Sequence, residues 1–180
     1  MASSPAPEAP IRRALVVGGP GAGKSTFARR LGEKLALPVI HLDFHYWRSG
    51  WQIPELDTWR AQAAVLAAAP GWIMDGNYSN TYDIRMPRAD SLIWLDYPRA
   101  VCMRRALLRI VKGYGRNRID LPQGCPEKFD AEFLRFVWDF RRKHRRQIVD
   151  GLERFGGHLR VTRFGHDREA AAFLAMVGAS

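Results

Sequence analysis

Residues 18–25 read Gly18-Gly19-Pro20-Gly21-Ala22-Gly23-Lys24-Ser25 and match the pattern G-x-x-x-x-G-K-[ST]. An apolar run precedes them at residues 14–17, and a segment with helical spacing follows, as this motif requires. Glycine backbones adopt conformations that are closed to other residues, so successive N–H groups can point at one anion. The start of the following helix adds its positive dipole end at the same place. The sequence therefore predicts a phosphate-binding loop between a first strand and a first helix.

The end of the motif predicts how a nucleoside triphosphate is held. Lys24 places a mobile cation on the β- and γ-phosphates, and the Ser25 hydroxyl can ligate Mg²⁺. Thr26 is the weaker alternative ligand, because the motif places the hydroxyl directly after the lysine. The residues expected to bind ATP·Mg²⁺ are Gly18, Gly19, Pro20, Gly21, Ala22, Gly23, Lys24, Ser25 and Thr26.

Length and composition set limits on the class of protein. The chain has 180 residues, of which 47% are apolar, so one α/β domain is expected. No apolar run approaches the roughly 18 residues that a membrane-spanning helix needs. Residues 1–10 lack the basic start and apolar middle of a secretory signal and predict a flexible tail. Cys102 and Cys125 are not spaced as a disulfide framework or a zinc site, which fits a cytoplasmic location.

The chain is strongly basic. It carries 28 Lys and Arg residues against 18 Asp and Glu residues, for a net charge of +10. Such a surplus suits nucleotides, nucleic acid or acidic lipid. Many of the arginines lie between Arg99 and Arg146, and arginine forms bidentate contacts with phosphates. This region can therefore serve phosphates in a cleft or a nucleic-acid backbone, or form a solvated surface.

Three acidic residues follow short apolar runs that predict strands. The three segments are residues 39–43, 72–75 and 91–96. Ligands of open α/β sheets bind beyond the carboxyl ends of the strands, so these carboxylates are aimed at the cleft. Asp43 can accept a proton from a substrate hydroxyl, hold water on Mg²⁺, or cap a helix. Asp75 and Asp96 compete for the Mg²⁺ role, with Gly76 favouring Asp75 and helix capping as the alternative for Asp96.

The acceptor side is expected around residues 44–51, which are dense in aromatic side chains. These rings and Arg48 can hold a planar base or a sugar, or the rings can pack as a small core beneath a loop. Arg85 and Arg88 follow the third strand and can reach a second, anionic substrate. The residue types leave both interpretations of the aromatic segment open.

Residues 98–112 predict an arginine-rich helix in which Arg105 and Arg109 share one face. Like charges at this spacing cost stability unless anions lie between them, so the pair is a candidate clamp on phosphates. Residues 113–127 follow as a turn-rich segment whose arginines can close over the phosphates as a lid, or lie on a plain surface loop. The two arginines are Arg116 and Arg118.

Residues 129–155 predict one long helix with an apolar side. Its basic block, residues 141–146, is the best local support for a nucleic-acid partner, although such a block is usually a solvated face. Residues 158–162 predict a fifth strand, and residues 167–177 predict the closing helix.

Several of these segments together resemble a known group. The chain resembles the adenylate kinase-like, or nucleoside monophosphate kinase-like, P-loop phosphotransferases, and more closely the small bacterial DNA topology modulation proteins, also called FlaR-like. The similar segments are residues 18–25, 39–43, 46–47, 72–78, 93–96, 124–127 and the long aromatic and basic helix. The resemblance implies an α/β, three-layer P-loop NTPase fold with five parallel strands in the order 2-3-1-4-5. Helices would cover both faces of a single domain, residues 11–180, with a small lid at about residues 113–127.

The resemblance also implies roles for individual residues. In adenylate kinases the aspartate of an Asp-Gly pair after the third strand serves the Mg²⁺ site, and Asp75 matches it. Arginines in the helix after the fourth strand contact phosphates, and Arg105 and Arg109 fall at that spacing. Arg85 is similar to the arginine that meets the acceptor phosphate, although the spacing here is longer.

Two functions follow from the sequence. The favoured one is an ATP-dependent phosphotransferase that moves the γ-phosphate to a small, nucleotide- or nucleoside-like acceptor. Its expected catalytic residues are Lys24, Arg105, Arg109 and Asp43, and its expected acceptor-binding residues are Asp43, Arg48, Asp75 and Arg85. The alternative is a nucleotide-dependent DNA-binding protein that modulates DNA topology, in which the basic block contacts the backbone. The chain carries no nucleic-acid recognition motif, and the sequence leaves the acceptor and the oligomeric state open.

Overall fold

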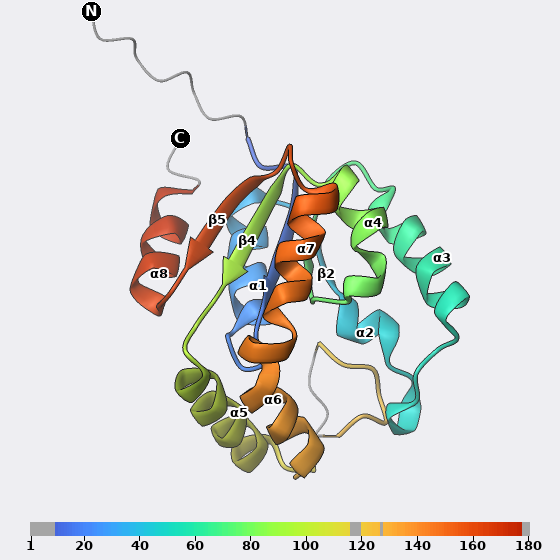
Figure 1. Cartoon of the computed structure of the whole chain (residues 1–180), viewed down its shortest axis with the longest axis vertical. Coiled ribbons are helices and arrows are strands. Elements are labelled where there is room, and N and C mark those ends of the chain that lie inside the picture. Colours follow the sequence, from blue (N-terminus) through green and yellow to red (C-terminus); the bar gives the residue numbers. More distant parts are fainter. Residues whose placement is uncertain (1–9, 116–119, 127, 178–180) are drawn as a thin grey trace, which may run out of the picture.

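The centre of the molecule is a parallel sheet of five strands (Figure 1). The computed structural model describes residues 10–115, 120–126 and 128–177. The strands are β1 (Arg13–Gly18), β2 (Val39–His41), β3 (Trp72–Asp75), β4 (Ser91–Leu95) and β5 (Arg160–Phe164). Their order is β2-β3-β1-β4-β5, and every pairing is parallel. The predicted strand order is confirmed.

The middle strand β1 delivers the phosphate loop to the centre of one edge of the sheet. In the parallel register Val16 lies opposite Asp75 of β3, and Gly18 lies opposite Leu95 of β4. The side chains of residues 14–17 are fully buried. A strand covered on both faces has a continuous apolar sequence, which is what residues 14–17 show.

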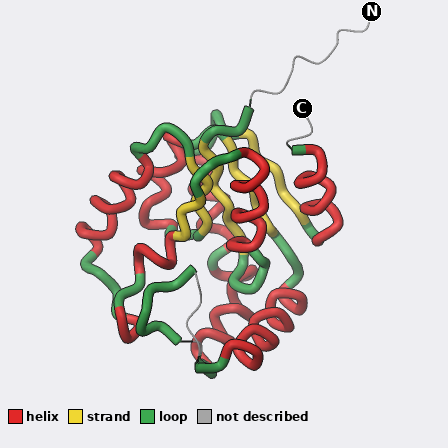
Figure 2. Tube along the Cα trace, turned by 180° about the vertical axis from the view of Figure 1, so that it is seen from behind, coloured by secondary structure: helices red, strands yellow, loops and turns green. Residues whose placement is uncertain are grey.

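Helices cover both faces of the sheet, as Figures 1 and 2 show. On one face α1 (Lys24–Leu35) and α8 (Asp167–Met176) pack over Ala14 and Val16 of β1. The opposite face is covered by α3 (Leu56–Ala67), α4 (Tyr82–Arg85) and α7 (Arg145–Phe155). Trp59 and Ile148 contribute to the core on that side, together with Leu15 and Val17. The predicted three-layer architecture is therefore confirmed.

The remaining helices gather beyond the carboxyl ends of the strands, at the lower end of Figure 1. They are α2 (Leu42–Tyr46), α5 (Arg99–Gly113) and α6 (Ala131–Lys143), with short 3₁₀ turns η1 (Ser49–Trp51), η2 (Ser79–Thr81) and η3 (Met86–Arg88) elsewhere in the chain. Within residues 10–115, 120–126 and 128–177, no helix has both the length and the apolar character needed to cross a bilayer.

The described part of the expected lid, residues 120–126, rests on η1. The Gly50 N–H donates to the Gly124 oxygen at 2.9 Å, and the Cys125 thiol donates to the Arg48 oxygen at 3.2 Å. Arg116 and Arg118, expected in the same lid, lie outside the described residues, as does most of the expected flexible tail.

The single helix predicted over residues 129–155 is wrong, because the chain breaks at His144 into α6 and α7. The His144 ring lies 4.9 Å from the Phe136 ring and 5.9 Å from the Phe140 ring. The break turns α7 onto the sheet, where Gly151 packs so tightly that an added Cβ would lie 2.6 Å from the Tyr82 ring. No proline or glycine marks the break in residues 141–147, so the sequence carried no signal for it.

Candidate functional site

The phosphate loop has the backbone that its glycines predict. Gly21 and Gly23 have φ of 80° and 89°, in the left-handed region. A Cβ on Gly21 would overlap the backbone oxygen of Cys102, because α5 passes directly against the loop. A Cβ on Gly23 would instead meet only the Arg105 guanidinium, at 4.0 Å. In the described structure no side chain caps α1. Its first N–H groups are thus suited to an anion placed over Gly23.

Lys24 bonds to the phosphate loop, and the charges of three other predicted site residues act on it. Its Nζ donates to the carbonyl oxygens of residues 18 and 19, each at 3.1 Å. Burial lowers the pKa of Lys24, whereas the charges of Asp43 and Asp75 raise it and the charge of Arg109 lowers it. The sheet places both carboxylates at the edge that carries the lysine, because Asp75 pairs with Val16 of β1 and Asp43 follows the neighbouring strand β2.

Asn77 ties the turn after β3 to the start of the phosphate loop. Its Oδ1 accepts from the Gly18 N–H at 3.0 Å, and its Nδ2 donates to the Gly18 oxygen at 2.9 Å. Gly76 before it has φ of 132°, and a Cβ there would lie 3.0 Å from the Leu42 side chain. The sequence analysis did not single out Asn77. An amide directly after an Asp-Gly turn at a strand end is the signal that could have found it.

Asp75 ends β3 with only 5% of its surface exposed, and its Oδ1 lies 2.6 Å from His41 Nδ1. Burial lowers the pKa of His41, but the hydrogen bond and the charge of Asp75 raise it, and its net pKa is above the ordinary value. Mg²⁺ prefers oxygen ligands and keeps several waters in phosphate-binding sites. The hydroxyl of Ser25 at the start of α1 and the carboxylate of Asp75 near Lys24 fit such an ion.

Asp43 is the second residue of α2 and accepts a hydrogen bond from the Tyr78 hydroxyl at 2.6 Å. Burial raises the pKa of Tyr78 well above its usual range, and the charge and hydrogen bond of Asp43 raise it further. Tyr78 therefore stays protonated and orients the carboxylate. It is a second site residue that the sequence analysis did not single out.

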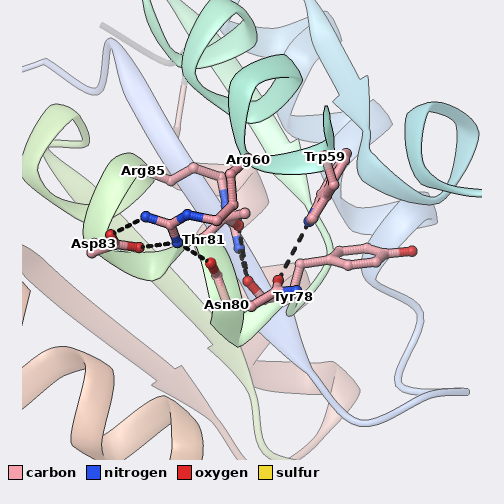
Figure 3. Close-up of polar contacts among 7 residues, drawn as sticks. All are labelled: Trp59, Arg60, Tyr78, Asn80, Thr81, Asp83 and Arg85. Carbon is pink, nitrogen blue, oxygen red and sulfur yellow. Dashed lines mark hydrogen bonds and ion pairs between the residues drawn. The ribbon is translucent and has the colours of Figure 1, made fainter. Parts of the chain in front are cut away.

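Arg85 is buried within the turn after β3, a setting that does not favour the acceptor-phosphate contact expected for it. The side chain is fully buried, and its Nε donates to Thr81 Oγ1 at 2.8 Å. Its Nη2 donates to the carbonyl oxygens of Asn77 and Tyr78 at 2.5 and 3.1 Å. Figure 3 shows the guanidinium on one side of this turn and the Tyr78 ring pointing away from it. Burial lowers the pKa of Arg85 to about 10, and its role here is to support the turn.

Two residues of α3 hold the same turn (Figure 3). Trp59 Nε1 donates to Asn80 Oδ1 at 3.3 Å. Arg60 forms an ion pair with Asp83 at 2.6 Å and also donates to the Asn80 backbone oxygen. The turn that carries Tyr78 is therefore fixed between α3 and α4.

Arg105 of α5 contacts the phosphate loop, whereas Arg109 packs on α6. Arg105 donates to the Ala22 oxygen at 3.5 Å and forms an ion pair with Asp167. Beside it lies a cavity of about 340 Å³. Among the residues that line it are Gly23, Thr26, Arg30, Tyr97, Arg105 and Asp167. Arg109 lies over the Phe133 ring of α6 at 5.2 Å, and its charge reaches Lys24.

Asp96 is surrounded by arginines. It pairs with Arg145 at 3.1 Å, with Arg141 at 3.9 Å, and with Arg163 of β5. It does not cap α5, whose N-cap is Pro98. These contacts favour Asp75 over Asp96 for the Mg²⁺ role. They also pair two arginines of the basic block with a carboxylate, which offsets part of the charge of the block.

The aromatic segment adjoins Asp43 through Tyr78. The Tyr46 ring lies 4.6 Å from the Tyr78 ring and 5.2 Å from the Trp47 ring, and Trp47 lies 5.3 Å from Trp51. The rings form a packed cluster, and Arg48 lies exposed beside them. Burial lowers the pKa of His45, and the charge of Arg48 lowers it further.

Solved structures with the same architecture are kinases. Shikimate kinase from Bacteroides thetaiotaomicron has a TM-score of 0.50 at 20% identity, covering 92% of this chain and 94% of that chain. The chain has the fold of P-loop kinases. Shikimate kinase from Acinetobacter baumannii in complex with shikimate gives 0.51 at 13% identity, covering 93% of each chain. A sugar kinase from Janibacter sp. gives 0.50 at 16% identity, covering 94% of this chain and 98% of that one. The sequence matches no family model and no curated protein.

Proposed function

We propose that the protein is an ATP-dependent phosphotransferase that moves the γ-phosphate of ATP to a hydroxyl group of a small acceptor. The observation that carries this proposal is the position of Lys24. It lies in a phosphate loop at the same edge of the sheet as two carboxylates, Asp43 and Asp75, which come from the ends of the neighbouring strands β2 and β3. The P-loop kinase fold supports the same reading.

On the donor side, the N–H groups of residues 18–25 and the start of α1 hold the triphosphate. Lys24 leaves its two carbonyl partners and binds the β- and γ-phosphate oxygens. The nucleoside enters the 340 Å³ cavity beside Thr26 and Arg105. Ser25 and, through water, Asp75 would hold Mg²⁺, which when bound neutralises charge on the transferring phosphoryl group.

On the acceptor side, Asp43 accepts the proton of the acceptor hydroxyl as that oxygen bonds to the γ-phosphorus, and the bridging oxygen departs with ADP. Tyr78 keeps the carboxylate oriented through its 2.6 Å hydrogen bond. Arg105 and Arg109 spread the charge of the transferring group. Arg116 and Arg118 remain candidates for closing over the phosphates.

The finer assignment, an adenylate kinase-like protein nearest the FlaR-like group, rests on sequence resemblance. The Asp75-Gly76 pair and the positions of Arg105 and Arg109 near the loop support it. Arg85 does not, because its guanidinium is buried in the turn where the resemblance expects an acceptor phosphate contact.

The test is transfer of labelled γ-phosphate from ATP to a panel of nucleosides, nucleotides and sugars, with the full chain and Mg²⁺. We expect product with at least one acceptor, and its loss in Lys24→Ala. Lys34→Ala, an exposed lysine in the last turn of α1, is the matched control. ATP binding without transfer to any acceptor would count against the proposal, and salt-sensitive DNA binding altered by ATP would favour the alternative.

A further inference from the structure

A line of aromatic rings leads away from Asp43. It begins at Tyr78, which holds the carboxylate, and continues through Tyr46 and Trp47 to Trp51 of η1. Neighbouring ring centroids lie 4.6 to 5.3 Å apart. Small-molecule sites are commonly lined by such rings, with a few polar groups that orient the ligand.

Trp51 stands at the far end of this line and has two unusual features. Its φ is 63°, in the left-handed region that residues other than glycine rarely adopt. Its indole Nε1 is buried and, within the described residues, has no hydrogen-bond partner. Because an indole N–H can only donate, it needs an acceptor atom, and a ligand oxygen or ring nitrogen supplies one.

The segment that covers η1 holds the two residues that lead into Trp51. Arg48 directly before the turn accepts from Cys125, and Gly50 within the turn donates to Gly124. Gly124 itself has φ of 84°, and an added Cβ would overlap the Ser49 hydroxyl. Strained residues persist where the surroundings determine them, and they cluster at ligand sites.

The charges near the transfer point suit a hydroxyl more than an anion. Asp43 and Asp75 lie at the edge of the sheet that carries Lys24, where the proposed reaction brings the acceptor to the γ-phosphate. Carboxylates accept hydrogen bonds from hydroxyl groups and repel phosphates and other carboxylates. Arg85, the arginine expected to offset that repulsion, is fully buried in the turn after β3. Its Nη2 donates to the carbonyl oxygens of residues 77 and 78 and its Nε donates to Thr81, while its Nη1 is buried and has no hydrogen-bond partner among the described residues.

We infer that the acceptor is an uncharged, ring-bearing alcohol of the nucleoside or sugar class, and that Trp51 donates its indole N–H to it. This inference rests on the proposed phosphotransfer. The reacting hydroxyl lies at Asp43, the ring of the acceptor lies along the aromatic side chains, and a ring oxygen, ring nitrogen or carbonyl meets Trp51. The phosphorylated or carboxylated counterpart of the same compound is a poor substrate.

The experiment compares matched pairs of acceptors with the wild-type chain, ATP and Mg²⁺. The pairs are adenosine with AMP, uridine with UMP, and glucose with gluconate. ADP release gives kcat/KM, and a fluorescent ATP analogue gives nucleotide affinity in the same samples. We expect at least one uncharged member to exceed its anionic partner by about tenfold, as one lost or opposed polar contact predicts.

The outcomes separate the two claims. Equal or better transfer to the anionic members overturns the inference and leaves the proposed function standing. Transfer to none of the six compounds while the ATP analogue binds also overturns the inference. Failure to bind the ATP analogue overturns the proposed function itself.

Trp51→Phe keeps a six-membered aromatic ring and removes the indole N–H together with the rest of the five-membered ring. We expect the KM for the uncharged acceptor to rise about tenfold, with kcat and the KM for ATP nearly unchanged. Trp138→Phe, at a tryptophan of α6 that is 48% exposed, is the matched control and leaves all three constants unchanged. An unchanged acceptor KM in a folded Trp51→Phe variant overturns the role of Trp51. The paired-acceptor result does not depend on how that variant folds.

Discussion

The donor and acceptor halves of the site are built by different means. The proposed donor half is one continuous stretch, residues 18–25, in which backbone N–H groups would bind the phosphates and the glycines make that backbone possible. The proposed acceptor half is assembled from side chains of separate segments: Asp43 in α2, Trp51 in η1, and Tyr78 after β3. A site formed by the backbone of one short stretch can therefore be predicted from a sequence motif. A site formed by side chains from separate segments can be identified only in the folded structure.

The largest effect is expected for a substitution that changes only the donor half of the site. Lys24→Ala removes the cation of the phosphate loop, and we expect kcat/KM to fall about 10²–10³-fold, as for loss of one transition-state contact. Steady-state kinetics and ATP titration measure it. An ATP affinity equal to that of the wild type and of Lys34→Ala would show that residues 18–25 do not hold the triphosphate.

The next test sharpens the distinction between two acidic strand ends. Asp75→Asn should lower Mg²⁺-dependent turnover about 10–100-fold, as loss of an outer-sphere group does, with little change in ATP affinity. Asp96→Asn should instead lower stability by about 1–3 kcal/mol, because Arg145 and Arg163 lose their carboxylate. Turnover and thermal melting separate the two, and the opposite pattern would give the metal role to Asp96.

A smaller effect is expected where the acceptor half is supported. Arg85→Met leaves the buried carbonyl oxygens of Asn77 and Tyr78 without their donor, which should lower the free energy of unfolding by about 1–3 kcal/mol. The KM for the acceptor should rise more than the KM for ATP. Urea unfolding and kinetics measure both, with the exposed Arg88→Met as control. An acceptor KM that stays constant while ATP binding weakens would contradict this assignment.

The smallest effect is a pH dependence. Burial lowers the pKa of His41, but the hydrogen bond and charge of Asp75 leave it above the ordinary value. Protonated His41 therefore stabilises the fold fully below its unfolded pKa of about 6.5, and this contribution disappears as the pH rises through the folded pKa. In Mg²⁺-free buffer the Tm difference between wild type and His41→Gln should be largest near about pH 6 and shrink towards about pH 9. A constant difference across that range would rule out this contribution.

The fold and the donor half could be predicted because their signals are local. Each buried strand is a short apolar run, and the phosphate loop is eight consecutive residues. The break at His144 could not be predicted, because it depends on Phe136, Phe140 and the docking of α7 onto the sheet. Arg85 was misassigned for the same reason. Its charge suggested an anionic ligand, and only the folded turn shows three oxygens already around it.

Asn77 has a consequence for how the two substrates bind. Its side-chain amide bonds to both the backbone N–H and the backbone oxygen of Gly18, and the next residue, Tyr78, donates a hydrogen bond to Asp43. We expect each substrate to act on this shared connection, so that binding of the first changes the site that the second meets. Thermodynamic linkage makes this coupling reciprocal, so ATP should raise the affinity for the acceptor by the same factor by which the acceptor raises the affinity for ATP.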